Sequence, residues 1–204
     1  MTDNTARAPV ALVPSASAAP ARRAIDLLAA ERAAADLLVA LGADLTGESL
    51  RGTPRRIAAA YAEMLTPREF EPTTFPNDEG YDELVVARSI PFHSLCEHHM
   101  LPFFGVAHVG YLPGERIVGL SKLARVVDLF ARDLQVQERL TKQIAGWLDG
   151  ELAPKGVGVV LEAEHLCMSL RGVHKSGTRT VTSALHGLVR EDQRTRQEFL
   201  ELTR

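Results

Sequence analysis

The chain has 204 residues, a formal net charge of −3, 46% hydrophobic residues and 24% charged residues. This length suits one domain with a substantial core, and the composition is typical of globular proteins rather than of disordered or fibrous ones. Because a general polyanion binder carries a large basic excess, the charge argues against nucleic-acid binding and requires any anion site to be a local cluster of Lys and Arg.

A tail and two helices are the first elements predicted in chain order. Residues 1–21 are rich in Ala, Pro and Ser without a sustained period, so we predict a disordered tail. Apolar residues and alanines at helical spacing predict a helix over residues 22–41. Thr53 as N-cap and Pro54 at the first helical position predict a second helix that ends near Pro67.

Strands and further helices are predicted in the middle of the chain. After a loop rich in Pro, Asn, Asp and Gly at residues 71–82, β-branched and aromatic residues predict strands at 84–92 and 106–112. Ser121 is a candidate N-cap for a third helix, and a fourth begins near residue 136. Both helices carry an apolar stripe, so we expect them to be half buried.

The last third of the sequence predicts strands and a terminal helix. A turn at residues 154–156 leads into residues 157–170, which are too β-branched at first and too alternating later to form a helix. A strand at 181–188 and a helix at 192–202 follow. Since helices and strands come in blocks, we predict an α+β fold with an antiparallel sheet and helices on one face.

Cys96-Glu97-His98-His99 is the first candidate site. Residues three apart lie on the same side of a turn, so Cys96 and His99 can bind one ion while His98 points elsewhere. Taken alone, this run more often marks a buried cysteine beside solvated histidines. The sequence has no secretion signal and no apolar run of about 18 residues that could span a membrane, which predicts a cytoplasmic protein with reduced thiols.

A second run, from Glu164 to Arg171, offers a third ligand. On a strand, alternate side chains share a face, so we expect the apolar residues of this run to pack inward and the opposite face to carry His165, Cys167, Ser169 and Arg171. An exposed edge strand is the alternative, but a cysteine is unusual on a solvent face and suits a Cys96/His99 pair. Three protein ligands would leave a position for water, as in catalytic zinc sites.

Other polar residues near these runs are candidates for acid–base chemistry and anion binding. The candidate acid–base groups are His98 and His165, because an imidazole titrates near neutrality, although each is alternatively a packed histidine that supports a ligand. Lys122 and Arg125 would project from the first turn of a helix opened by Ser121, where backbone N–H groups also attract anions, and a solvated helix face is the alternative.

Gln137 and Glu138 fall in the first turn of the helix predicted from residue 136. A carboxylate there stabilises the start of a helix, and this accounts for Glu138 without any ligand. Alternatively, the carboxylate accepts hydrogen bonds from an amino-purine edge.

Four runs, in this order and spacing, resemble the GTP cyclohydrolase I family: CEHH, GLSKLARVVDLFARDLQVQERLT, HLCMSLRGV and TVTSALHG. The resemblance covers about residues 24–204 and implies the tunnelling fold, an antiparallel sheet with helices on one face, preceded by an N-terminal helical segment. It divides the chain into the tail at 1–21 and a catalytic domain at 22–204, with a helical part at 22–66 and a tunnelling-fold core at 83–204.

The resemblance also implies an activity. Members of the family convert GTP and water into formate and 7,8-dihydroneopterin triphosphate, an early step in tetrahydrofolate and pterin biosynthesis. They open the guanine ring at C8 with a water activated by zinc, one ion per subunit. They are typically homodecamers of two pentamers, with active sites at subunit boundaries. The alternatives are a tunnelling-fold pterin synthase, which normally binds zinc through three histidines, and a non-catalytic nucleotide-binding oligomer.

Individual roles follow from the same resemblance. It implies zinc ligands at Cys96, His99 and Cys167, protonation of N7 by His165, and assistance to ring opening by His98. The purine-binding residues correspond to Gln137 and Glu138, and the residue near the ribose corresponds to Ser121. The triphosphate contacts correspond to Lys122, Arg125, Arg171 and, from a neighbouring subunit, Arg56.

Overall fold

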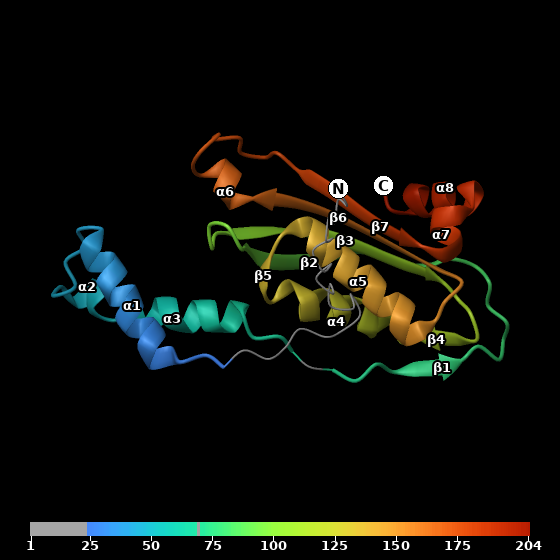
Figure 1. Ribbon diagram of the computed structural model, residues 1–204, viewed down its shortest axis with the longest axis horizontal. Helices are drawn as coiled ribbons and strands as arrows, with labels where there is room; N and C mark the ends of the chain where they lie inside the picture. The colour runs from blue at the N-terminus through green and yellow to red at the C-terminus, as the bar shows by residue number, and fades with distance from the viewer. Residues whose placement is uncertain (1–23, 69) are drawn as a thin grey trace, which may run out of the picture.

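The computed structural model describes residues 24–68 and 70–204, so the tail predicted at 1–21 lies outside the described residues. The helices are α1 (Leu27–Ala40), α2 (Glu48–Arg51), α3 (Thr53–Met64), α4 (Leu120–Ala131), α5 (Gln137–Leu152), α6 (Leu166–Ser169), α7 (Gly187–Glu191) and α8 (Gln193–Leu202). The strands are β1 (Thr74–Pro76), β2 (Val85–Cys96), β3 (Pro102–Leu112), β4 (Arg116–Val118), β5 (Leu134–Gln135), β6 (Gly156–His165) and β7 (Thr180–His186). This arrangement confirms the α+β class (Figure 1).

One sheet forms the centre of the described part of the chain, with the strand order β5-β2-β3-β6-β7. The long strands β2, β3, β6 and β7 pair antiparallel, as predicted. The short strand β5 joins parallel to the end of β2 through Leu95 and Cys96. A separate antiparallel pair joins β1 and β4. The parallel pairing holds the last residue of β2 close to the start of α5.

Helices α4 and α5 cover one face of the sheet, and the core lies between them and β3 and β6 (Figure 1). Their apolar stripes are buried, as the sequence predicts. Each fully buried leucine or phenylalanine stabilises the fold by roughly 1.5–3 kcal/mol relative to an exposed one. At one end of the opposite face, the buried ring of Phe199 on α8 packs against Gly158, where the Cβ of any larger residue would lie 2.6 Å from that ring. A glycine at this position of β6 therefore makes room for α8.

Helices α1, α2 and α3 form a separate group at the other end of the molecule (Figure 1). The Tyr61 hydroxyl donates to the carbonyl of Met100 at 3.1 Å, and Arg132 donates to the carbonyl of Glu63 at 2.9 Å. These bonds attach α3 to the turn between β2 and β3 and to the end of α4. No helix in residues 24–68 and 70–204 is both long and apolar enough to cross a membrane.

Several predicted boundaries are wrong. The first helix begins at Leu27 with Asp26 as its N-cap, rather than near residue 22. Thr53 is the first residue of α3 and Ser121 lies within α4, so neither is an N-cap. In both cases a glycine occupies the N-cap position, and no side chain caps the helix. The end of the second helix at Met64, by contrast, agrees with the prediction that it ends near Pro67.

The strand predicted at 157–170 is also wrong beyond His165, because the chain turns into the short helix α6. The Glu164 carboxylate accepts a hydrogen bond from the Ser169 hydroxyl at 2.7 Å and another from the amide of Gly177 at 2.9 Å. Side chains that bond locally in this way compete with strand pairing. As a result Leu170 does not pack inward and is 65% exposed.

The remaining strands differ from the prediction in their extent. β2 continues to Cys96 and β3 begins at Pro102, so both are longer than predicted. β7 ends at His186, and the residues that follow form α7 before Asp192 caps α8. Pairing with neighbouring strands, which no local pattern reports, extends β2 and β3.

Candidate active site

The turn between β2 and β3 brings Cys96 and His99 together. Cys96 is buried at the end of β2, and its carbonyl accepts a hydrogen bond from the amide of Met100 at 2.8 Å. Met100 has a φ of 54°, a left-handed conformation that closes the turn tightly. The Cys96 Sγ lies 3.9 Å from Nδ1 of His99. The predicted i, i+3 pair therefore shares one side of the turn.

Cys167 completes the group from α6. Its Sγ lies 4.0 Å from the Sγ of Cys96, about twice the length of a disulfide bond, so both thiols are free. The ligand atoms of Cys96, His99 and Cys167 all lie within 4.8 Å of one another. Two sulfurs bound tetrahedrally to one zinc ion lie about 3.8 Å apart. The residues present therefore fit a metal ion with little movement.

The protonation of Cys167 depends on that ion. Burial, followed by the nearby Cys96 sulfur, raises the pKa of the Cys167 thiol. Without an ion the group therefore stays neutral at neutral pH, and two thiolates together are disfavoured. A divalent cation reverses this preference, so metal binding must release protons.

His165 lies beside the metal-binding group at the end of β6. Its ring stacks on Phe103 with centroids 4.6 Å apart and an interplanar angle of 3°. Its Nε2 lies 2.8 Å from Oε1 of Gln137, and because that oxygen only accepts, the imidazole donates from Nε2. Burial lowers the pKa of His165, and the charge of Glu138 opposes this effect.

Gln137 is oriented by the protein itself. Its Nε2 has three acceptors, the carbonyls of Leu161 and Thr180 and the hydroxyl of Thr182, at 2.9 to 3.1 Å. These contacts direct the oxygen of the amide toward His165. Gln137 is only 1% exposed, so its amide cannot rotate without breaking several bonds.

A hollow of about 240 Å³ joins these groups. It is lined by Cys96, His98, His99, Val136, Gln137, Glu138, His165, Cys167, Met168 and Thr180. The structure thus brings together every predicted metal ligand, both candidate acid–base groups and the pair from α5. Sequence reasoning missed Val136, Met168 and Thr180. Their side chains indicate no particular chemistry, and they line the hollow only because of where the fold places them.

His98 and Arg171 border this hollow in different ways. The expectation that His98 points elsewhere is wrong, because its Nδ1 lies 3.9 Å from the Cys96 Sγ. Its Nε2 lies 3.8 Å from Oε1 of Glu97, and its side chain is 63% exposed. The Arg171 guanidinium lies beside His99, with Nη1 3.2 Å from Nε2. A positive charge therefore stands next to the metal-binding group, as expected of an anion contact.

Three other predicted residues lie elsewhere in the same copy of the chain. Ser121, Lys122 and Arg125 are in the first turns of α4, whereas the far end of α4 leads into β5 beside Cys96. Because α4 ends at Ala131 and a helix rises about 1.5 Å per residue, Ser121 and Lys122 lie roughly 15 Å and Arg125 roughly 9 Å from its far end. None of the three lines the hollow beside the metal-binding group in one copy of the chain.

Lys122, Arg125 and Arg56 have other neighbours in the described structure. Arg125 lines a separate hollow of about 380 Å³ with Arg68, Phe70 and Asp128. The Lys122 Nζ lies 5.7 Å from the centroid of the Phe70 ring. Arg56 donates to the carbonyl of Ser49 and to the hydroxyl of Thr53, which keeps it within the N-terminal helices.

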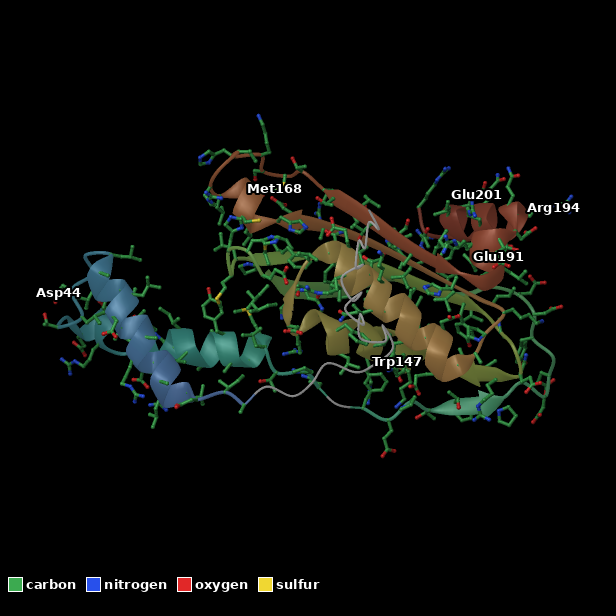
Figure 2. All side chains as sticks on the ribbon, in the orientation of Figure 1. Asp44, Trp147, Met168, Glu191, Arg194 and Glu201 are labelled. Carbon is green, nitrogen blue, oxygen red and sulfur yellow. The ribbon has the colours of Figure 1, made fainter. Side chains whose placement is uncertain are left out.

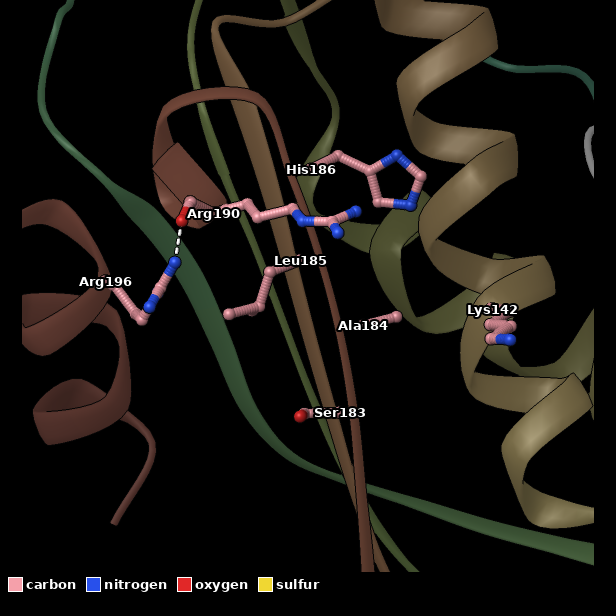
Figure 3. Close-up of a pocket in the computed structure, with 7 residues that line it drawn as sticks. All are labelled: Lys142, Ser183, Ala184, Leu185, His186, Arg190 and Arg196. Atoms are coloured by element: carbon pink, nitrogen blue, oxygen red, sulfur yellow. Dashed lines mark hydrogen bonds between the residues drawn. The ribbon is translucent and has the colours of Figure 1, made fainter. Parts of the chain in front are cut away.

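A larger hollow of about 540 Å³ lies along β7 between α5 and α7 (Figure 3). It is lined by Lys142, Ser183, Ala184, Leu185, His186, Arg190 and Arg196, and none of these is a predicted site residue. The metal-binding group is at the other end of the sheet, where Figure 2 shows Met168 on α6, far from Glu191 and Arg194. The larger of the two hollows is therefore not the one that holds the candidate catalytic residues.

Known proteins share this chain's sequence over most of its length. The model of the family described as GTP cyclohydrolase I matches residues 30–204. The chain is 51% identical over 181 residues to GTP cyclohydrolase 1 of Aquifex aeolicus, covering 89% of this chain and 98% of that protein. It is 52% identical over 178 residues to GTP cyclohydrolase 1 of a Sulfurihydrogenibium species, covering 87% and 95%. It is 50% identical over 193 residues to GTP cyclohydrolase 1 of Mycobacterium bovis, covering 92% and 96%.

Proposed function

The chain belongs to the GTP cyclohydrolase I family, and we propose that it converts GTP and water into formate and 7,8-dihydroneopterin triphosphate. One observation carries the proposal. Cys96, His99 and Cys167 converge within 4.8 Å beside a hollow lined by Glu138 and His165. A metal-binding group, a carboxylate and an imidazole are the parts that hydrolytic opening of a purine requires.

The ion assigned to Cys96, His99 and Cys167 is zinc, one per subunit. Two thiolates and one imidazole are typical zinc ligands, and three protein ligands leave one position open, as in catalytic sites. When bound, such an ion acts as a Lewis acid and lowers the pKa of a water molecule. The same donor set argues against a tunnelling-fold pterin synthase, whose zinc ligands are three histidines.

Glu138 and Gln137 form the purine-binding pair. A carboxylate accepts hydrogen bonds, so Glu138 suits the N–H groups on the amino-pyrimidine edge of guanine. Gln137 is buried, and both the nitrogen and the oxygen of its side-chain amide are hydrogen-bonded. It therefore also holds His165 in position beside the bound purine. A base bound by Glu138 would lie in the hollow that His165 also lines.

His165 and His98 are the acid–base residues. Protonation of guanine N7 makes C8 electrophilic, so a proton donor at N7 and a water attacking C8 are complementary. We assign the proton on N7 to His165, which the Phe103 ring and Gln137 hold in one orientation. His98 is exposed at the rim, where it can exchange protons with solvent while the ring opens and formate leaves.

The triphosphate contacts are Arg171 of one subunit and Lys122, Arg125 and Arg56 of neighbouring subunits, with Ser121 near the ribose. Four cationic side chains match a triphosphate that carries about four negative charges. The distance between the first turns of α4 and Cys96 within one copy supports a site shared between copies. We therefore propose the homodecamer of two pentamers, in which β7 would find a partner for its outer edge.

We further propose residues 22–204 as the catalytic domain, with a helical part at 22–66, a core at 83–204 and a tail at 1–21. A cytoplasmic location suits two thiols that remain unpaired at 4.0 Å. Neither nucleic acid nor membrane is proposed as a partner.

Metal analysis combined with a product assay tests the proposal. The purified protein is expected to contain one zinc per subunit, to release formate from GTP, and to form a fluorescent pterin after oxidation. In Cys167→Ala we expect metal and turnover to be lost together while the assembly persists. A zinc-loaded protein that binds GTP without releasing formate would refute the proposed reaction. The remaining hypothesis would then be the non-catalytic nucleotide-binding oligomer.

A further inference from the structure

The turn that carries Cys96 and His99 is fastened to the rest of the protein by Glu97. Glu97, between Cys96 and His98, directs its carboxylate to Arg139, with Oε2 2.5 Å from Nη2. The amide of Glu97 also donates to the carbonyl of Gln135 in β5 at 3.0 Å. The turn is thus held through both its backbone and a side chain.

Arg139 is itself held from several directions. Its Nε donates to Oε1 of Gln135 at 3.0 Å, and its Nη2 also donates to the carbonyl of Leu134 at 2.8 Å. Gln135 is 1% exposed and donates in turn to the carbonyl of Phe130 and to Oε1 of Gln143. Isolated surface ion pairs contribute little, but this guanidinium is fixed by a buried amide, so its geometry is defined.

Arg139 lies next to Glu138 in the first turn of α5. One guanidinium therefore connects the turn that carries Cys96 and His99 with the turn that carries Gln137 and Glu138. Neither Glu97 nor Arg139 lines the hollow, so neither is expected to touch substrate.

We propose that Arg139 and Glu97 are positioning residues, which set the distance between the metal-binding turn and the purine-binding turn. The other oxygen of the same carboxylate, Oε1, lies 3.8 Å from Nε2 of His98, so Glu97 also restricts where that imidazole points. The inference rests on the proposed function, because a fixed spacing matters only if a metal and a purine react across it. Displacements of about 1 Å at such a site lower rates by roughly 100-fold.

The variants Arg139→Met and Glu97→Gln test this inference, with Arg139→Lys as the conservative replacement. Lys142→Met is the matched control, because Lys142 is an exposed cation on the same helix and belongs to neither turn. Each protein is measured as the intact assembly. The readouts are kcat and KM for GTP, the rate at which a chelator removes zinc, the visible spectrum after cobalt replaces zinc, and the midpoint of thermal unfolding.

In Arg139→Met and Glu97→Gln we expect kcat to fall about 10- to 100-fold and zinc to leave about 10-fold faster, as when a group that supports metal ligands is removed. The cobalt spectrum should change in both, the unfolding midpoint should stay within a few degrees of wild type, and Arg139→Lys should recover part of kcat. Combining both substitutions should lower kcat by less than the product of the two single effects, since both remove the contact between Glu97 and Arg139.

Unchanged zinc release and an unchanged cobalt spectrum in both single variants would overturn the inference, as would fully additive effects in the double variant. Lys142→Met should match wild type in every measurement. The spectrum and the chelator rate do not depend on turnover. A wild-type protein that released no formate would therefore refute the proposed reaction, whereas the metal measurements would still decide whether Arg139 and Glu97 hold the turn.

Discussion

At the scale of single residues, His165 makes contacts on both its ring face and its ring edge. Phe103 stacks on the ring, and Gln137 accepts the hydrogen on Nε2 at 2.8 Å. The orientation and the tautomer are thereby set before any substrate binds, and Nδ1 is the nitrogen available for proton exchange. A group prepared in this way lowers the barrier because little rearrangement remains at the moment of reaction.

Replacing His165 by alanine is expected to abolish ring opening. General acid catalysis contributes about 100- to 10,000-fold, so formate release should fall by at least about 100-fold. Zinc content and GTP binding should be retained, because His165 is not part of the metal-binding group. A formate assay measures the loss of ring opening, and equilibrium dialysis measures whether GTP binding is retained. Formate release at the wild-type rate would remove His165 from the mechanism.

His108 predicts a dependence of stability on pH. It is 7% exposed, and burial, assisted by the charge of Arg88, lowers its pKa from the ordinary value of 6.5. Below pH 6.5 the unfolded chain therefore binds a proton that the folded chain does not, so stability falls as the pH drops through 6.5.

Comparing wild type with His108→Gln by urea unfolding at pH 7.5 and pH 5.5 measures this contribution. The variant is expected to lose less stability between the two pH values than wild type. His165 also titrates with a lowered pKa, but it is present in both proteins and cancels in the comparison. An identical loss in the two proteins would contradict the assignment.

At the scale of elements, the short helix α6 determines where Cys167 lies. β6 would carry residues 166–170 straight on as a strand, but the carboxylate of Glu164 accepts hydrogen bonds from Ser169 and Gly177 and folds the segment back. The amide of Lys175 also donates to the carbonyl of Met168 at 3.0 Å. This closed loop carries Cys167 to Cys96 and holds Arg171 at His99.

Glu164→Ala should loosen that loop without unfolding the sheet. The Ser169 hydroxyl and the Gly177 amide lose a shared anchor, so hydrogen exchange at Gly177 is expected to accelerate at least about 10-fold. Both hydrogen bonds lower the pKa of Glu164, the bond from the Gly177 amide having the larger effect. The anchor is therefore present at neutral pH and is lost as pH falls through that lowered pKa. Exchange at buried amides of β6 serves as the control, and unchanged exchange at Gly177 would show that the loop is held by other contacts.

At the scale of the whole molecule, the proposed site residues occupy two distant regions. The metal-binding group, Glu138 and His165 line or adjoin one hollow, and no residue from the first turns of α4 lines it within one copy. Charge attraction over that span would be screened at physiological ionic strength, where the Debye length is about 8 Å. The proposed assembly would bring Lys122 of a second copy to a triphosphate bound beside Arg171.

Mixing two inactive variants tests this arrangement. Cys167→Ala and Lys122→Ala are each expected to be inactive or nearly so, whereas their coassembly should restore about one quarter of the wild-type activity, because sites shared between copies recombine. Cys167→Ala mixed with His165→Ala is the control, since both residues come from the same copy and no intact site can form. Activity in the first mixture no greater than that of its separate components would refute a shared site.

The sequence by itself determined the class of fold, the metal-binding pair and the helices that bear apolar stripes. These follow from short-range periodicity: Cys96 and His99 are close because three residues make one turn, and α4 and α5 bury one face because apolar residues repeat at helical spacing. Only the tertiary structure decided how Cys167 meets Cys96 and where β6 ends. Bonds from Glu164 to residues farther along the chain override the local alternation, and strand pairing sets contacts between residues far apart in sequence. The separation of Lys122 from the metal-binding group is likewise a property of the folded chain, because it depends on the direction in which α4 crosses the sheet.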